Sequence, residues 1–447
     1  MTATRTARWF DRYREPPQTG IAPGRIAELV VEETRGMRPL PAYPVALQPL
    51  LLPLAEFREL LRAATDLLAL IRRAVLHAAP DRAGRIAAFG IDPADTPLFT
   101  ADEDFELQHC ADMGRADVVI GPDGPRFVEF NVSGAFGGMP DCHAHQQAWR
   151  RITTLAGRPA YLGVDPWAPL AALVERTCAE FGVPPGIVVV DDVGDGTVLA
   201  TDRSVQMLLD GLRTHGIEAT HVQVADLLDT LGHPGTLRYP VGLCGFDLDD
   251  MRAVGHDVRP ARRALDAGFR MIPSQTSWLL HTKKVLARLS EGAPWMDAAD
   301  RDLVARYVPW SRVVGDRPVT WRGRRYELPR LLIEHRESFV LKGATGCSAQ
   351  EVTFGLWTKP ADWARLVDEG ARTGYPVAQE VVRSAPYPVD VLAESGEITR
   401  VAANAVVSPF VLGGVGAGCT ARFDWAERPG VVLCANGAVE TCLLAEL

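Results

Sequence analysis

Apolar residues recur at two different spacings along the chain, and each spacing predicts a different kind of element. Between residues 53 and 79 they return every three or four positions, which is typical of a packed amphipathic helix. Between residues 166 and 275, short apolar runs such as GIVVVDD alternate with helical patterns. Strands that alternate with helices form parallel sheets with crossover helices, so we expect such a sheet in the middle of the chain.

A chain of 447 residues exceeds a single core, and two or three domains are expected. The alternating segment predicts a Rossmann-like domain at residues 164–275, although G-x-G-x-x-G is missing after its first strand. Downstream, the pattern predicts one helix at residues 276–292 and a linker rich in Pro, Trp and Arg at residues 312–325. Strands and a further helix follow, and the last strands form an antiparallel sheet.

Residues 114–131 predict a β-hairpin, because two apolar runs flank a turn rich in Gly, Pro and Asp. Side chains alternate between the two faces of a strand. We expect Ile120 to pair with Arg126. Asp117 then lies directly opposite Glu129, with Cβ atoms about 5 Å apart.

The same register places Arg115 opposite Asn131. Like charges at facing positions repel each other, and a divalent cation between the two carboxylates would remove that repulsion. Carboxylate and amide oxygens are the hard ligands that Mg²⁺ prefers. The pattern therefore predicts a magnesium site at Asp117, Glu129 and Asn131, and a solvated edge hairpin is the alternative.

A second candidate site begins at Lys342, which ends an apolar strand and precedes a loop of small residues. A buried lysine is costly unless an anion meets it, and such a loop can close its N–H groups over phosphate oxygens. We expect a nucleoside triphosphate here, with an edge-strand lysine that reaches water as the alternative. The loop residues expected to bind phosphate are Gly343, Ala344, Thr345, Gly346 and Ser348.

Two weaker features belong to the same region. Lys284 lies on the helix predicted at residues 276–292. A later apolar strand ends in acceptor and backbone groups that could bind the amino group and ring nitrogen of adenine. These residues are Gln379, Glu380, Val381 and Val382.

The order of these features resembles that of the nucleotide-binding elements in ATP-grasp enzymes: a helix lysine, a strand lysine with a small-residue loop, and Gln-Glu-Val-Val. In most of that superfamily the magnesium ligands come later in the chain. Here Arg-x-Asp and Glu-x-Asn come earlier, at an interval similar to that in glutathionylspermidine synthase, a circularly permuted member. The resemblance extends from about Pro44 to Arg422.

The resemblance implies a mixed α/β, circularly permuted ATP-grasp fold with a Rossmann-like pre-ATP-grasp domain. Residues 1–163 would hold the N-terminal helices and the metal-binding part, and residues 276–447 the nucleotide-binding lobes. The family's Asn-x-Asp sequence reads Asn131-Val132-Ser133 here, and no amidase domain precedes the ligase. Glutathione and spermidine are therefore not carried over as substrates, and stand-alone permuted ligases are more similar.

The function implied is ATP-dependent ligation of a small carboxylate to a small amine through an acyl phosphate, as in small-peptide or natural-product biosynthesis. ATP and Mg²⁺ would be required, Arg115 would steady the carboxylate or the oxyanion, and Arg422 would contact phosphate or substrate. The loop after Lys342 would exclude water from the acyl phosphate. A phosphotransferase and a non-catalytic nucleotide-binding protein are the alternatives.

Net charge and cysteine spacing limit the kinds of partner and the cellular compartment that we expect. A formal net charge of −9 and a pI near 5.6 argue against nucleic acid or an anionic membrane as principal partner. Charges near the start occupy the place of a signal peptide's apolar core, and the eight cysteines form no C-x-x-C pair, so we expect a cytoplasmic protein with reduced thiols. Cys142, His143 and His145 suggest zinc only weakly, because no second ligand pair follows. The oligomeric state, a homodimer included, stays open.

Overall fold

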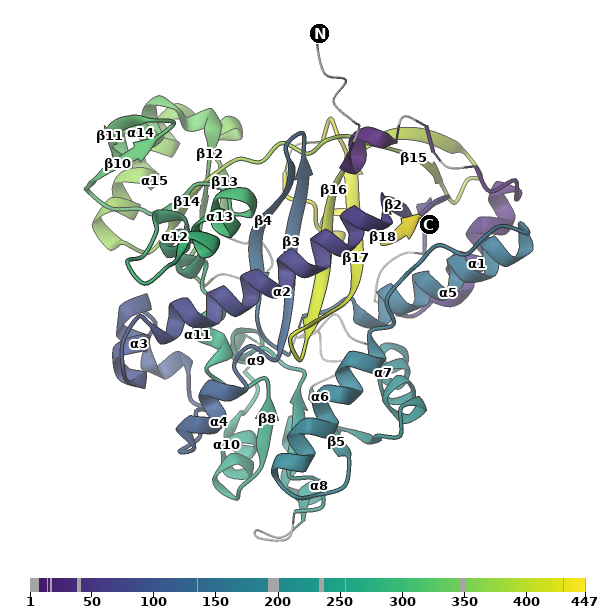
Figure 1. Cartoon of the computed structure of the whole chain (residues 1–447), viewed down its shortest axis with the longest axis horizontal. Helices are drawn as coiled ribbons and strands as arrows, with labels where there is room; N and C mark the ends of the chain where they lie inside the picture. Colours follow the sequence, from purple (N-terminus) through teal and green to yellow (C-terminus); the bar gives the residue numbers. More distant parts are fainter. Residues whose placement is uncertain are drawn as a thin grey trace.

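The computed structural model describes residues 8–13, 15–16, 18–37, 42–134, 136–191, 201–232, 237–253, 255–345, 351–428 and 430–446. The chain has a mixed α/β fold with three main sheets. In Figure 1, a central sheet lies between a parallel sheet below it and a smaller antiparallel sheet at the upper left. The candidate site described below uses the central sheet, the smaller antiparallel sheet and the helices that follow β8 (Arg270–Ile272).

The central sheet joins segments from both ends of the chain. Its order is β1-β15-β16-β17-β18-β2, and β3 pairs with both β16 and β4. All of these pairs are antiparallel except that of β18 with β2. The strands are β1 (Val45–Ala46), β2 (Leu50–Pro53), β3 (Met113–Gly121), β4 (Gly124–Asn131), β15 (Tyr387–Leu392), β16 (Ile398–Leu412), β17 (Val415–Trp425) and β18 (Val439–Glu446).

A long helix, α2 (Leu54–Leu76), lies across the central sheet (Figure 1) and confirms the helical pattern in this part of the sequence. Its apolar face, with Phe57, Leu60 and Leu67, is buried in the largest hydrophobic core. None of the described helices is long and apolar enough to cross a membrane. The other helices before residue 160 are α1 (Pro23–Thr34), α3 (Arg82–Phe89), α4 (Glu103–Gln108) and α5 (Met139–Leu155).

The predicted parallel sheet is confirmed. Its order is β6-β5-β7-β8, and every pair is parallel. The strands are β5 (Gly186–Asp191), β6 (Glu218–Gln223), β7 (Val241–Cys244) and β8 (Arg270–Ile272). The helices of this segment are α6 (Trp167–Glu180), α7 (Asp202–Thr214), α8 (Leu227–Leu231), α9 (Leu248–Ala253) and α10 (Arg259–Asp266).

The third main sheet is antiparallel and has the order β13-β12-β14-β9. The prediction of a linker at residues 312–325 is wrong, because this stretch contains short strands that place Val319 and Trp321 in a hydrophobic core. The strands of this sheet are β9 (Ser311–Val313), β12 (Phe339–Lys342), β13 (Val352–Phe354) and β14 (Val377–Glu380), and β10 (Pro318–Trp321) and β11 (Arg324–Glu327) form a separate two-stranded antiparallel sheet. The helices are α13 (Ala298–Tyr307), α14 (Leu328–Glu334) and α15 (Pro360–Thr373).

The single helix predicted at residues 276–292 is also wrong, because the helix breaks at Thr282. It forms α11 (Ser277–His281) and α12 (Lys283–Glu291), and Thr282 has an extended backbone with ψ 131°. The hydroxyl of Thr282 and the N–H of Lys283 both donate to the carbonyl of Ala344, at 3.1 and 2.8 Å. These bonds to the loop after β12 replace helical bonds, so tertiary contacts set the break.

Candidate active site

The hairpin of β3 and β4 supports the first half of the site. Asp117 pairs with Glu129 and Arg115 pairs with Asn131, as the sequence predicts. Asp117 and Glu129 have side chains only 13% and 20% exposed, so the solvated hairpin is excluded. The two carboxylates therefore share one buried face of the sheet.

The pairing expected between Ile120 and Arg126 is wrong, since Ile120 pairs with Pro125. A β-bulge after Asp117 leaves Val128 as an extra residue and shifts the register by one. The carbonyl of Val128 accepts bonds from the side chains of Lys342 and Gln379. Thus a bulge next to the carboxylates ties the hairpin to the antiparallel sheet of β12 and β14.

Lys342 is one of these donors. Its ammonium group lies 3.0 Å from the carbonyl oxygen of Val128, and the residue is only 7% exposed. The alternative in which Lys342 reaches out to water is therefore wrong. Burial lowers the pKa of Lys342 to about 8, and Lys283 acts in the same direction while Glu129 opposes it.

Asp117 is held by three side chains from the central sheet. Its carboxylate accepts from Arg422 and from the Ser408 hydroxyl, both at 2.8 Å, and Arg115 lies 3.7 Å away. Burial favours the protonated acid, but Arg422 and Arg115 outweigh it and lower the pKa of Asp117 to about 2. Asp117 is thus a fixed anion, and Arg422 is in direct contact with it.

Glu129 has its own cationic partners. The ammonium group of Lys283 lies 3.0 Å from the carboxylate. Burial opposes ionisation, but Lys283 and Lys342 outweigh it and lower the pKa of Glu129. The repulsion that the sequence indicates between Asp117 and Glu129 is therefore offset by cations already present in the protein.

The structure does not bring Lys284 into this cluster, and the adjacent Lys283 takes the position expected for it. The ammonium group of Lys284 donates to the carbonyl of Phe89 at 3.1 Å. The break at Thr282 sets which of the two lysines faces the hairpin. A continuous helix gives no reason to prefer one over the other, so the sequence offered no signal for this choice.

The remaining members of the hairpin make bonds of their own. The guanidinium of Arg115 donates to the carbonyl of Gly137 at 2.8 Å, in the loop that follows β4. The amide of Asn131 donates to the carbonyl of Arg115 at 3.4 Å. Both side chains therefore stay on the same side of the hairpin as the carboxylates.

The segment expected to bind adenine is used partly inside the protein. The amide of Gln379 donates to Val128 and to Ser311, at 3.3 and 3.2 Å, so this side chain supports the bulge. Glu380 pairs with Arg322 at 2.7 Å. The N–H groups of Glu380 and Val381 donate to backbone carbonyls, and Val382 follows the end of β14.

The loop after Lys342 is described only in part. Gly343 lies so close to Glu351 that a Cβ atom there would be 1.7 Å from the carboxylate, which explains the glycine. Ala344 bonds to the start of α12, and the Thr345 hydroxyl lies 3.4 Å from that of Tyr375. The predicted phosphate ligands Gly346 and Ser348 lie outside the described residues.

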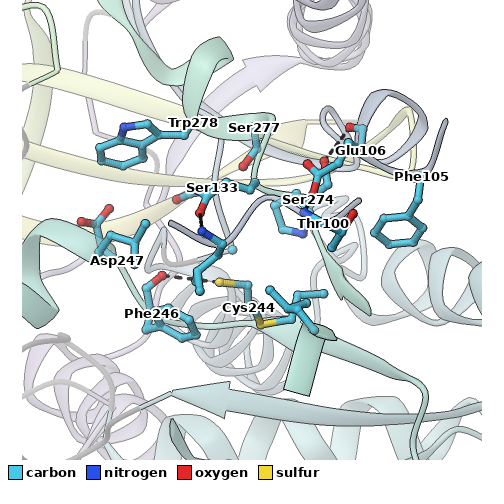
Figure 2. A pocket seen from close by; sticks show the side chains of 17 residues that line it. Thr100, Phe105, Glu106, Ser133, Cys244, Phe246, Asp247, Ser274, Ser277 and Trp278 are labelled. Atoms are coloured by element: carbon cyan, nitrogen blue, oxygen red, sulfur yellow. Dashed lines mark hydrogen bonds between the residues drawn. The ribbon is translucent and has the colours of Figure 1, made fainter. Parts of the chain in front are cut away.

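A cavity of about 40 Å³ (Figure 2) is lined by residues at the carboxyl ends of the parallel strands β7 and β8. Its lining includes Ser133, which is two residues after Asn131, and Trp278 on α11. The ring of Trp278 stacks on His281, with ring centroids 5.4 Å apart. Burial and Lys283 lower the pKa of His281 to about 4. Helix α11 therefore carries one residue that lines the cavity, Trp278, and one whose pKa is affected by a lysine of the cluster, His281.

The structure also shows two residues that the sequence did not indicate. Ser408 reaches Asp117 because β16 pairs with β3, and Ser408 lies in the middle of a long strand without a motif. His281 precedes the helix break and contributes to the electrostatics of Glu129. Neither residue can be identified until segments that are distant in the sequence are placed side by side in the fold.

The donor set matches a magnesium ion in chemistry. Asp117, Glu129 and Asn131 offer hard oxygen atoms on one face of the hairpin. Within the described residues, no group of three or more His, Cys, Asp or Glu side chains is placed to hold a metal. Cys142 and His145 are buried in α5, and neither forms part of such a group.

No family model and no curated protein matches this sequence. A solved structure of a glutathione synthetase-like effector from Globodera pallida, in its apo form, has a TM-score of 0.60 and 14% sequence identity, and the match covers 97% of this chain and 100% of that chain. The two proteins share a fold. The predicted mixed α/β class is confirmed, and the fold is similar to that of this glutathione synthetase-like protein.

A protein from Methylobacillus flagellatus, provisionally assigned as a γ-glutamylcysteine synthetase, has a TM-score of 0.37 and 14% identity, and the match covers 82% of this chain and 83% of that chain. That score is too low to support an argument. The likeness to the Globodera protein shows the fold alone, and the chemistry of this chain has to be argued from its own side chains.

Proposed function

We propose that this protein is an ATP-dependent carboxylate–amine ligase. The observation that carries the proposal is one buried cluster in which four cationic side chains surround two carboxylates. The cluster has a formal surplus of two positive charges, which suits a phosphate chain better than a bare metal ion. Its cations are Arg115, Lys283, Lys342 and Arg422.

The use of lysine supports a phosphate site. Of the 47 Lys and Arg residues in the chain, only four are lysines. Two of these four, Lys283 and Lys342, are buried at the cluster with relative exposures of 6% and 7%. A compact ammonium group is a common phosphate ligand, so lysine in these two buried positions is consistent with binding of ATP.

The fold supports the same class of reaction. The similar Globodera protein is described as glutathione synthetase-like, and a synthetase of that kind joins a carboxylate to an amine with ATP. The hairpin before residue 132 pairs with strands after residue 397, as expected of a circularly permuted ATP-grasp protein in stand-alone form. We propose the division into residues 1–163, 164–275 and 276–447 on the same grounds.

In the proposed reaction, an oxygen of the substrate carboxylate attacks the γ-phosphorus of ATP, and ADP leaves. The acyl phosphate then accepts the nitrogen of the amine, loses phosphate and gives the amide. Lys283 and Lys342 would bind phosphate oxygens, while Arg115 and Arg422 would steady the carboxylate and the oxyanion. Asp117, Glu129 and Asn131 would hold Mg²⁺, which supplies neutralisation of phosphate charge.

Hydroxylamine trapping tests the proposal. The protein, ATP and Mg²⁺ are incubated with a library of small carboxylates and hydroxylamine, which captures acyl phosphates as hydroxamates. We expect ADP and a hydroxamate to form together for at least one carboxylate. ADP without hydroxamate would indicate a phosphotransferase, and no ADP release with any substrate would indicate a non-catalytic nucleotide-binding protein. Lys342→Met, which removes a buried cation of the cluster, should reduce the formation of both products, and Lys359→Met, which changes an exposed lysine, is its control.

A further inference from the structure

The cavity in Figure 2 contains two carboxylates, and no Lys, Arg or His is among the described residues that line it. Glu106 lies at one end beside Phe105, and Asp247 lies at the other end near Trp278 (Figure 2). A cavity with this charge favours a cation and disfavours an anion. The two acids differ in how their oxygen atoms are used.

Glu106 has a structural role. One of its oxygen atoms accepts from the N–H of Thr100 at 2.8 Å, and the other accepts from the N–H and the hydroxyl of Thr276, both at 3.0 Å. These bonds fix the segment before α4 against the start of α11. Its acceptor capacity is directed into the protein, so Glu106 is not the residue that would bind a ligand.

Asp247 is different. Its Oδ1 atom accepts from the N–H groups of Asp249 and Asp250, at 2.8 and 3.4 Å, at the start of α9. The second oxygen, Oδ2, accepts no hydrogen bond from the described residues, although Asp247 is only 9% exposed. Burial and the nearby acids raise the pKa of Asp247 to about 6, so it is mostly ionised at neutral pH without a cationic partner in its pocket.

The walls around Asp247 are narrow and partly apolar. The apolar residues of the cavity wall include Leu248, Leu265 and Met271, its polar residues include Ser133 and Gln275, and the aromatic ring of Trp278 lies at the same end as Asp247 in Figure 2. A volume of about 40 Å³ holds a small polar head group rather than a whole ligand. An ammonium group benefits from both the carboxylate and the aromatic ring.

We propose that this cavity binds the ammonium group of an aliphatic amine, with Asp247 as its counter-ion. The inference rests on the proposed function and names its second substrate: an amine that carries no carboxylate next to its nitrogen, because a further negative charge would meet no cation here. Ser133 follows Asn131 by two residues and Trp278 stacks on His281, so two segments that line the cavity continue into the cluster where the acyl phosphate would form.

Equilibrium binding without nucleotide tests this site. Straight-chain amines from ethylamine to butylamine, and the carboxylates of the same lengths, are titrated into the protein at neutral pH and followed by saturation-transfer NMR. We expect the amines to bind and the carboxylates not to bind. Asp247→Asn should weaken amine binding by about tenfold or more, because it removes the charge and keeps a side chain that can cap α9.

Asp250→Asn is the matched control, since it removes a nearby charge from a residue that does not line the cavity. Its amine affinity should stay within about twofold of the wild type. Equal binding of amines and carboxylates by the wild type, or unchanged amine affinity in Asp247→Asn, would overturn the assignment. The wild-type comparison decides even where the variant does not fold. Because no ATP is present, a failed ligase assay and a failed amine site give separate results.

Discussion

The ammonium group of Lys283 lies 3.0 Å from the carboxylate of Glu129. This contact joins the first turn of α12 to the hairpin, and it exists because the helix breaks at Thr282. On the other side of the pair, Arg422 and Ser408 hold Asp117. The two carboxylates are therefore compensated before any ligand binds, and the protein without ligand does not store the repulsion that the sequence indicates.

Substitution of Glu129 by glutamine tests this compensation. Glu129→Gln leaves Lys283 and Lys342 without their nearest counter-charge in a buried site, so we expect the free energy of unfolding to fall by about 3 kcal/mol. Urea denaturation in metal-free buffer measures it. Glu334→Gln, which changes an exposed helix residue, should leave stability unchanged. A Glu129→Gln protein as stable as the wild type, or more so, would mean that repulsion dominates the pair.

The two adjacent lysines should differ in nucleotide binding. Lys283→Met removes a cation from the cluster, and we expect ATP affinity in the presence of Mg²⁺ to fall by about tenfold or more. Lys284→Met removes a lysine bonded to Phe89, outside the cluster, and should change the affinity by less than about twofold. Isothermal titration calorimetry compares them directly. The opposite order of effects would restore Lys284 to the site.

The pH dependence of ATP binding should report on Lys342. Its pKa is lowered to about 8 in the free protein, chiefly by burial, and a phosphate group beside it would favour the charged form. Binding should therefore take up a proton near pH 8, and affinity should fall as the pH rises above that value. Calorimetry in buffers with different ionisation enthalpies measures the uptake. It should disappear in Lys342→Met and persist in Lys359→Met.

Ser408 should stabilise the protein through Asp117. Ser408→Ala removes a 2.8 Å bond to a buried carboxylate, and we expect a loss of about 1 to 2 kcal/mol in the free energy of unfolding. Ser395→Ala, in an exposed position, is the control. Because the pKa of Asp117 is lowered, its contribution is present at neutral pH and is lost as the pH falls through about 2. An unchanged stability in Ser408→Ala would show that Arg422 and Arg115 hold Asp117 without help from Ser408.

Local patterns predicted the elements that define the site. Alternation within β3 and β4 was enough to bring Asp117 opposite Glu129, and apolar runs located the parallel sheet. The same alternation gave the wrong pairing for Ile120, because a bulge at Val128 has no signature in the sequence. The pairing near the carboxylates survived because the bulge lies on the turn side of them.

Features set by tertiary contacts could not be predicted in this way. The break at Thr282 depends on bonds to Ala344, which lies about sixty residues away in the chain. Ser408 reaches Asp117 only through the pairing of β16 with β3. Asp247 follows a short buried strand, and its unused oxygen is visible only once the walls of the cavity are in place.

The products of ATP cleavage test the central claim most directly. The protein is incubated with ATP, Mg²⁺ and mixtures of small carboxylates and aliphatic amines, and the phosphorus-containing products are identified by ³¹P NMR. Lys283 and Lys342 are assigned to the terminal phosphate of ATP, together with the Mg²⁺ that Asp117 and Glu129 would hold. The account therefore predicts ADP and orthophosphate in equal amounts. AMP and pyrophosphate as the stoichiometric products would contradict it.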